Sequence, residues 1–210
     1  MGMDFPSGSS SDPTRYYREW STPPYDYKWI RNRTQILARS SLTSPDALPK
    51  VFTLPTSGYR SYQVRISGMG FNAPAQPYLE MSTDGTTFAL DSSHRWDCLY
   101  MSPTGYTHAL GTATGVSSRG ALLGAAMWPT GDSQGNCMAV VDIYPGSPSS
   151  WPTCFVASRE VFPANAYYEM WLSCYRVGPG PVKAIRLVAY NSTPAVVNFS
   201  RGYYDVIGYP

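Results

Sequence analysis

From about residue 51 onwards, apolar and polar residues alternate along the chain with a period of two. In the segment YRSYQVRISG, the apolar residues Tyr62, Val64 and Ile66 are separated by single polar residues. Successive side chains of a β-strand point to opposite faces, so this pattern predicts a strand with one buried face.

Similar apolar runs follow, and each ends close to a Gly, Pro or Asn. They are PYLEMSTDG, CMAVVDIYPGSP, AYYEMWLSCYRVGPGP, VKAIRLVAY and GYYDVIGY. Short strands separated by frequent turn signals are typical of a β-sandwich or a β-barrel. The sequence therefore predicts an all-β, antiparallel body over residues 51–210, and it shows no strand–helix alternation of the kind that forms a parallel sheet.

The segment STDGTT contains the clearest turn signal in the chain. Asp84 can accept hydrogen bonds from the backbone two residues onward, and Gly85 adopts a positive φ without steric cost. An Asp-Gly pair between apolar runs predicts a β-hairpin, here with flanks at 79–81 and 88–90. A calcium loop would need further oxygen ligands at alternate positions, and this segment supplies one carboxylate.

The first 50 residues differ from the body, and we expect them to form an extended N-terminal arm. Residues 1–14 are rich in Ser, Gly, Pro and Asp, whereas residues 15–33 are dense in aromatic side chains that require a packing partner. Apolar residues at Trp29, Ile30, Ile36 and Leu37 have a spacing that is compatible with a short helix.

The charged residues are balanced in the body, and one segment near the N-terminus is locally basic. The body carries nine Lys/Arg and nine Asp/Glu, so it offers no broad basic face to nucleic acid. Residues 28–39 contain four basic residues and no acidic one. That run is compatible with a solvated face, a nucleic-acid contact or a dock onto an acidic protein partner.

Cysteine and histidine, which often act as catalytic residues or metal ligands, are few and widely spaced in this sequence. Four cysteines at 98, 137, 154 and 174 form no CxxC pair, so we expect free thiols, with a disulfide as the alternative. His94 and His108 lack the spacing of metal ligands, and no GxSxG or GxxxxGK[ST] motif occurs. We therefore expect no catalytic residue, metal or cofactor, although paired carboxylates of a glycosidase remain an alternative.

No segment of the sequence predicts secretion or membrane insertion. The N-terminus MGMDFPSGSSSDP lacks the apolar core of a signal peptide, and no run of about 18 apolar residues occurs.

Tryptophan could bind carbohydrate by stacking on sugar rings. Among Trp96, Trp128, Trp151 and Trp171, the core of the sandwich is the simpler location for any one of them. Trp128 and Trp151 lie in loop-like surroundings, where binding residues are common, so these two are the glycan-binding candidates.

Four segments in this order resemble a module of tailed-bacteriophage structural proteins. The segments are 59–68, 79–88 with STDGTTF, 184–189 with AIRLVA, and 202–208 with GYYDVIG. The resemblance covers about residues 55–210. It implies a jelly-roll β-sandwich in a tail fibre, spike or decoration protein, which acts as a homotrimer and binds host-surface glycans.

Taken together, the pattern and the resemblance predict a non-enzymatic virion protein of the tail-fibre or spike type, assembled in the host cytoplasm. A capsid decoration or head-fibre protein is the first alternative, and a virion glycosidase is the second. The arm would bind other virion proteins, and the body would bind a host glycan, with neither nucleic acid nor membrane insertion involved. The attachment candidates are Tyr16, Tyr17, Trp20, Tyr25, Tyr27, Trp29, Arg31, Arg33 and Arg39.

Overall fold

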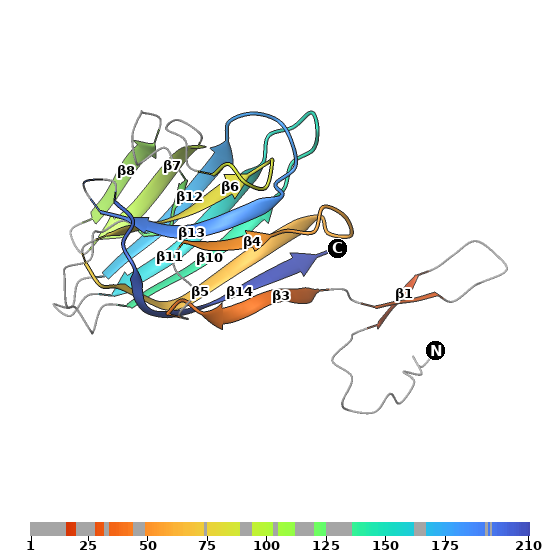
Figure 1. Cartoon of the computed structure of the whole chain (residues 1–210), viewed down its shortest axis with the longest axis horizontal. Helices are drawn as coiled ribbons and strands as arrows, with labels where there is room; N and C mark the ends of the chain where they lie inside the picture. Colours follow the sequence, from red (N-terminus) through yellow and green to blue (C-terminus); the bar gives the residue numbers. More distant parts are fainter. Residues whose placement is uncertain are drawn as a thin grey trace, which may run out of the picture. The chain divides into compact units, whose positions relative to one another are not determined.

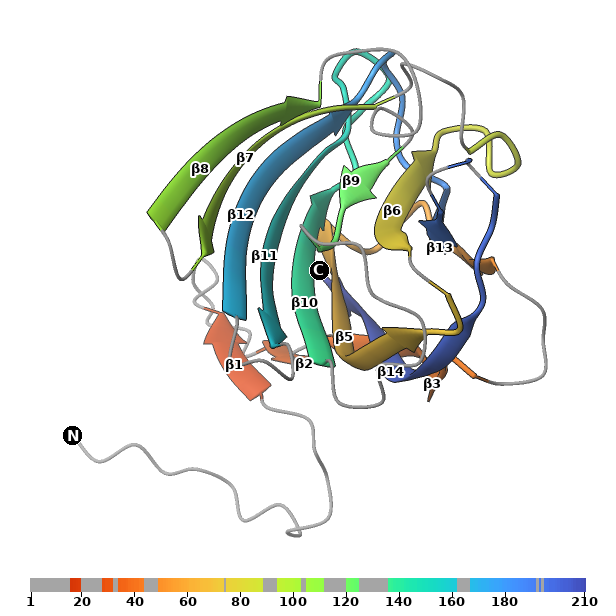
Figure 2. The same ribbon diagram turned by 90° about the vertical axis from the view of Figure 1, so that its left-hand side faces the viewer.

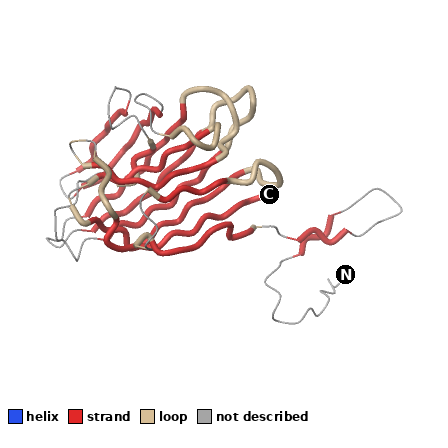
Figure 3. Tube along the Cα trace, viewed as in Figure 1, coloured by secondary structure: helices blue, strands red, loops and turns tan. Residues whose placement is uncertain are grey.

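The structure is a computed structural model of the whole chain. It describes residues 16–19, 28–31, 34–43, 49–73, 75–88, 94–102, 105–111, 120–124, 136–161, 167–191, 193 and 195–210. Every regular element in this part of the chain is a β-strand (Figure 3). The described residues contain no helix with the length and hydrophobicity that a membrane span requires.

The chain divides into an N-terminal unit, Met1–Thr34, and a body, Gln35–Pro210. In the N-terminal unit, β1 (Tyr16–Glu19) pairs antiparallel with β2 (Lys28–Arg31). The short helix suggested by the apolar spacing is absent, because Trp29 and Ile30 lie in β2. Ile36 and Leu37 lie in β3, a strand of the body.

The body consists of two antiparallel sheets (Figure 1). The eight-stranded sheet has the order β3 (Gln35–Ser41), β14 (Phe199–Tyr209), β5 (Ser61–Phe71), β10 (Asn136–Tyr144), β11 (Thr153–Val161), β12 (Tyr167–Arg176), β7 (His94–Ser102), β8 (Gly105–Gly111). The four-stranded sheet has the order β4 (Lys50–Thr53), β13 (Ala184–Tyr190), β6 (Gln76–Ser82), β9 (Ala121–Leu122). The antiparallel β-sandwich predicted from the sequence is confirmed.

Each strand of the small sheet comes between two strands of the large sheet in the sequence. The chain runs β3–β4–β5–β6–β7, then β8–β9–β10, and finally β12–β13–β14, changing sheet at each of these steps. This repeated crossing gives the sandwich its jelly-roll-like character. Figure 2 shows the small sheet against one face of the curved large sheet, opposite β5, β10 and β14.

The crossing topology overturns one prediction. Asp84 and Gly85 do form a turn, and Gly85 has a φ of 93°. The strand before the turn, β6, pairs with β13 and β9 and not with the strand that follows. The chain leaves the turn for β7 in the other sheet, so the predicted hairpin is wrong and the turn is part of a crossover.

The boundary of the body also differs from the sequence-based one. The strand β3 pairs with β14 from Gln35 to Ser41, and β4 pairs with β13. The strand β3 therefore belongs to the large sheet and β4 begins at Lys50 in the small sheet, so the compact body begins at Gln35 and not at Val51.

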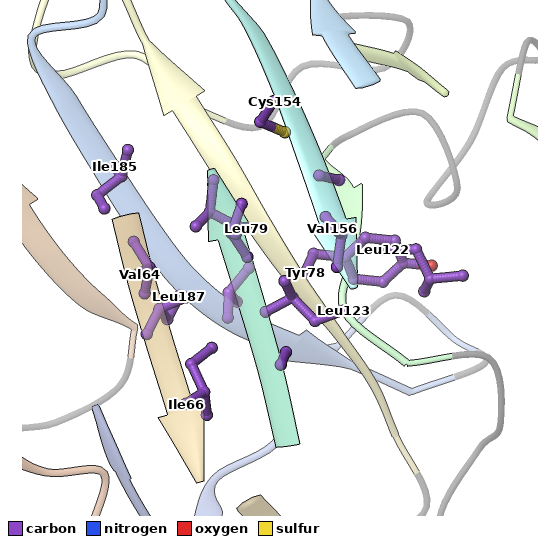
Figure 4. Packing of buried hydrophobic residues seen from close by; sticks show 14 of the residues in the cluster. Val64, Ile66, Tyr78, Leu79, Leu122, Leu123, Cys154, Val156, Ile185 and Leu187 are labelled. Atoms are coloured by element: carbon purple, nitrogen blue, oxygen red, sulfur yellow. The ribbon is translucent and has the colours of Figure 1, made fainter. Parts of the chain in front are cut away.

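The core lies between the two sheets. Leu79 from β6 and Ile185 and Leu187 from β13 point towards Val64 and Ile66 from β5 (Figure 4). All five side chains are at most 3% exposed. Val64 and Ile66 are positions that the period-two pattern assigned to one face, because alternate residues of a strand share a side of the sheet.

The outer face of the small sheet is buried along β6 and β13, where it holds a charged pair. The Arg186 guanidinium donates to the Glu80 carboxylate, and the Tyr190 hydroxyl donates to the same carboxylate at 2.8 Å. Glu80 is fully buried. The guanidinium carbon of Arg186 lies 4.8 Å from the centre of the Phe88 ring, which adds a cation–π contact.

The central packing of the two sheets should dominate stability. We expect Leu79→Ala to lower the free energy of unfolding by about 3 kcal/mol, because it removes apolar atoms and leaves a cavity between the sheets. Val51→Ala is the matched control, since Val51 is 49% exposed on β4; its cost should stay below about 1 kcal/mol. Equal losses for the two variants in equilibrium chemical unfolding would contradict this assignment of the core.

Candidate functional site

The large sheet has a buried inner face and an exposed outer face. Its inner face carries a continuous buried row that crosses six strands: Val206, Val64, Val141, Val156, Leu172 and Cys98. The neighbouring positions form the outer row Arg39, Asp205, Arg65, Val140, Ala157, Trp171 and Leu99. The outer face thus mixes charged residues at one end with apolar residues at the other.

Several large apolar side chains are exposed on the part of this outer face that β7, β10, β11 and β12 form. Leu99, Met138, Val140, Tyr144, Phe155 and Trp171 are between 38% and 57% exposed. A contiguous exposed apolar surface on a folded protein commonly marks a binding site.

A groove of about 450 Å³ opens on this outer face across four neighbouring strands. We call it the aromatic groove. The outward-facing residues that line it are Arg95 and Asp97 of β7, Tyr144 of β10, Thr153 and Phe155 of β11, and Ser173 and Tyr175 of β12. The lining also includes Trp96, Cys154 and Cys174, which alternate with these residues and have buried side chains.

The strand register orders the groove into two rows. Tyr144 pairs with Thr153, Thr153 with Tyr175, and Tyr175 with Arg95. Two residues along the strands, Phe155 pairs with Ser173, and Ser173 pairs with Asp97. One row is therefore aromatic and cationic, and the other carries an aromatic ring, a hydroxyl and a carboxylate.

The turn between β10 and β11 places Trp151 beside the aromatic groove. Its ring stacks on that of Tyr175, with centroids 5.4 Å apart and planes inclined by 29°. The turn needs Gly146, which has a φ of 78°. A Cβ at Gly146 would lie 3.0 Å from the Ser150 carbonyl oxygen and 2.9 Å from the Pro152 nitrogen. Trp151 remains 48% exposed, as expected for a residue that can contact a ligand.

The other tryptophans have different positions. Trp128 lies outside the described residues, so its candidacy stays a prediction. Trp96 is 8% exposed and belongs to the core. Trp171 is 39% exposed and lines a second, smaller depression of about 250 Å³ on the same face.

Sequence reasoning missed Tyr144, Phe155 and Tyr175 as candidates. A signal for them was present, because in CMAVVDIY both sets of alternate positions are largely apolar. A strand that meets water on one face usually alternates apolar and polar residues. Apolar residues at both sets of positions indicate that the second face also has something to contact.

The attachment candidates are divided between the two units. Tyr16 and Tyr17 lie in β1, while Trp29 and Arg31 lie in β2, where Arg31 is opposite Tyr16. Four further candidates lie outside the described residues: Trp20, Tyr25, Tyr27 and Arg33.

Arg39 belongs to the body and has a partner there. Its guanidinium donates to both carboxylate oxygens of Asp205, at 2.6 and 3.0 Å. The hydrogen bonds from Arg39 lower the pKa of Asp205, and burial opposes this shift. The pair cross-links β3 to β14, so Arg39 does not form part of an independent N-terminal arm.

The carboxylates of the 79–88 segment have structural partners. Asp84 Oδ1 accepts hydrogen bonds from the backbone of Thr86 and Thr87, at 2.8 and 2.7 Å, and from the Ser82 hydroxyl at 2.7 Å. Together with a hydrogen bond from the Thr87 side chain, which has the largest effect, these hold the pKa of Asp84 far below its ordinary value. Asp84 is thus a turn residue.

His94 and the four cysteines are buried. The Nε2 atom of His94 accepts a hydrogen bond from the Met81 backbone at 3.0 Å. None of the four cysteines forms a disulfide, and Cys154 lies opposite Cys174 in the register of β11 and β12. Burial, together with the neighbouring thiol, raises the pKa of Cys174. Within the described residues, no group of three or more His, Cys, Asp or Glu could hold a metal ion.

Comparison of the chain with protein-family models, with curated proteins and with solved structures finds no match.

The Asp84 turn should make stability depend on acidity. Its pKa in the folded chain lies below the ordinary value of 3.8. The ionised carboxylate therefore stabilises the fold above that pH, and this stabilisation is lost as the pH falls below it. We expect the melting temperature of the Asp84→Asn variant to fall less steeply than that of the wild type between about pH 5 and pH 2. Parallel melting curves over this range would show that the ionised turn does not contribute.

Proposed function

We propose that this chain is a non-enzymatic, carbohydrate-binding structural protein of a bacteriophage virion, of the tail-fibre or spike type. The aromatic groove would hold a glycan of the host surface. The observation that carries the binding function is this groove, which opens on the exposed face of a sheet whose other face is packed into the core.

The chemistry of the groove suits a sugar. Tyr144, Phe155 and Tyr175 offer flat apolar rings, and pyranose rings also have flat apolar faces that can lie against them. The hydroxyls of Thr153 and Ser173 supply hydrogen-bonding groups between the rings. Small-molecule sites in general combine a mostly apolar lining with a few polar groups that fix orientation.

The groove is also held by a rigid framework. Its lining residues lie on the strands β7, β10, β11 and β12, each of which pairs with a neighbour on both sides. Side chains on paired strands lose little further freedom when a ligand binds, so less binding energy is spent on ordering the site.

The virion setting rests on the motifs of residues 59–68, 79–88, 184–189 and 202–208. In that setting the body acts as a homotrimer, and the N-terminal unit attaches it to other virion proteins. The aromatic residues of that unit, including Tyr16, Tyr17 and Trp29, are of the types that dominate protein interfaces.

A capsid decoration or head-fibre protein is the second candidate. It is favoured by the apolar surface that continues beyond the aromatic groove through Leu99, Val140 and Trp171. Such a surface suits contact with another protein as well as with a sugar. A glycosidase would need two facing carboxylates, and Asp97 is the one carboxylate among the described residues that line the groove.

The groove aromatics should be required for glycan binding. We expect Tyr175→Ala to weaken binding to immobilised bacterial capsular or lipopolysaccharide glycans about tenfold, because it removes one stacking surface and the support of Trp151. Tyr203→Ala is the control, since Tyr203 is an exposed tyrosine of the same face that lies in β14 and outside the groove. Unchanged binding in Tyr175→Ala, or absence of binding in the wild type, would contradict the proposal.

The N-terminal unit should be separable from the body. Deletion of residues 1–34 leaves β3 intact, so we expect a body with an unchanged melting temperature that no longer joins the virion. Deletion through Ser41 is the informative comparison, because it removes a strand and should destabilise the body. Incorporation of the 1–34 deletion into particles at the wild-type level would disprove the anchoring role.

A further inference from the structure

We infer that the glycan bound in the aromatic groove is anionic and that Arg95 binds its charged group. This inference rests on the proposed carbohydrate-binding function and adds the class of sugar and its orientation. Three observations support it. The other arginines on this face have partners within the protein, and Arg95 lies in the groove beside Tyr175. The opposite charges of Arg95 and Asp97 lie in different rows of the groove.

The other arginines on the outer face of the large sheet have partners. Arg39 binds Asp205, as described above. Arg65 donates through Nε to the Gln63 side-chain oxygen at 2.5 Å. Arg159 lies 3.5 Å from the Glu169 carboxylate. Charged side chains on this sheet are thus usually matched by an acceptor of the protein itself.

Arg95 differs from these arginines. It is exposed, and the structure gives it no ion pair or hydrogen bond with any part of the described chain. Arginine remains charged throughout the physiological pH range, so its guanidinium keeps a full set of donors available. A planar guanidinium matches a carboxylate or a phosphate group with two parallel hydrogen bonds.

The surroundings of Arg95 favour a sugar-borne anion. Arg95 is directly opposite Tyr175 in the strand register, and Tyr175 in turn stacks on Trp151. A sugar lying on the aromatic rings at this end of the groove would bring a ring substituent towards the guanidinium. An ion pair beside apolar rings is less screened by water than one on an open surface.

The carboxylate of Asp97 lies in the other row of the groove, on the same strand as Arg95. It is two residues from Arg95 on β7, which corresponds to about 7 Å along a strand. Asp97 also interacts with another part of the chain. An anionic group would avoid this row, whereas neutral sugar hydroxyls can donate to the carboxylate and to Ser173 opposite it. The ligand is thus oriented with its charge towards Arg95 and its hydroxyls towards Asp97.

The test compares matched oligosaccharides by isothermal titration calorimetry of the full-length chain. The probes are a hexuronate-containing oligosaccharide, its carboxyl-reduced neutral counterpart and a phosphate-substituted oligosaccharide of the same length. We expect an anionic probe to bind at least about tenfold more tightly than the neutral one at low salt, since hydrogen bonds to charged groups are the stronger kind. Which anionic probe is preferred distinguishes a carboxylate from a phosphate.

Arg95→Gln should abolish this preference and leave binding of the neutral probe within about twofold of the wild type. Arg65→Gln is the control, because it removes an exposed arginine of the same face outside the groove. Its preference for the anionic probe should be unchanged, and the melting temperatures of both variants should match the wild type.

The possible failures are distinguishable. If the neutral probe binds as tightly as both anionic ones, or if Arg95→Gln keeps the preference, the inference about the anion is overturned and glycan binding stands. If none of the probes binds and immobilised host glycans also fail to bind, the proposed function itself is overturned.

Discussion

The packing of the small sheet against one face of the large sheet is the contact on which the rest of the structure depends. Leu79, Ile185 and Leu187 meet Val64 and Ile66 across this interface, and all are almost completely buried. Burial of such side chains stabilises a fold by roughly 1.5–3 kcal/mol each. Because the four-stranded sheet covers only the inner face, the outer face of the eight-stranded sheet stays open to solvent, and the candidate site lies there.

The strands β6 and β13 of the small sheet, in contrast, are buried on both faces. Its outer side holds the carboxylate of Glu80, which accepts hydrogen bonds from Arg186 and Tyr190. A buried carboxylate is costly unless a cation and further donors satisfy it, and here both are present. Removal of one partner would leave the other charge unmatched, so the pair ties β6 to β13.

The aromatic groove shows how one strand can contribute both to the core and to an exposed groove. On β11, buried and exposed side chains alternate. Cys154 and Val156 are buried, whereas Thr153 and Phe155 face outward. The strand alternation therefore supports the groove from below with close-packed side chains. Rings held in this way need little rearrangement to meet a ligand, which is why a groove on a sheet can bind as specifically as a loop.

The local features of this protein follow from its amino-acid pattern alone. The period-two pattern predicted the strands and the face to which Val64 and Ile66 belong, and the Asp84–Gly85 turn was recognised from its own chemistry. Both depend on residues within a few positions of one another. The bacteriophage resemblance and the role of Trp128 stay predictions, because neither the comparisons nor the described residues test them.

The pairing of the strands and the exposure of one face depend on contacts between distant parts of the chain. The turn after β6 suggested a hairpin, but the partners of β6 are β13, about 100 residues later, and β9. Arg39 was assigned to an arm, but it binds Asp205, which lies 166 residues away. Tyr144, Phe155 and Tyr175 line one groove because β10, β11 and β12 lie side by side in the sheet. Alternation tells which residues share a face of a strand, whereas the burial of that face depends on long-range register, which no local pattern encodes.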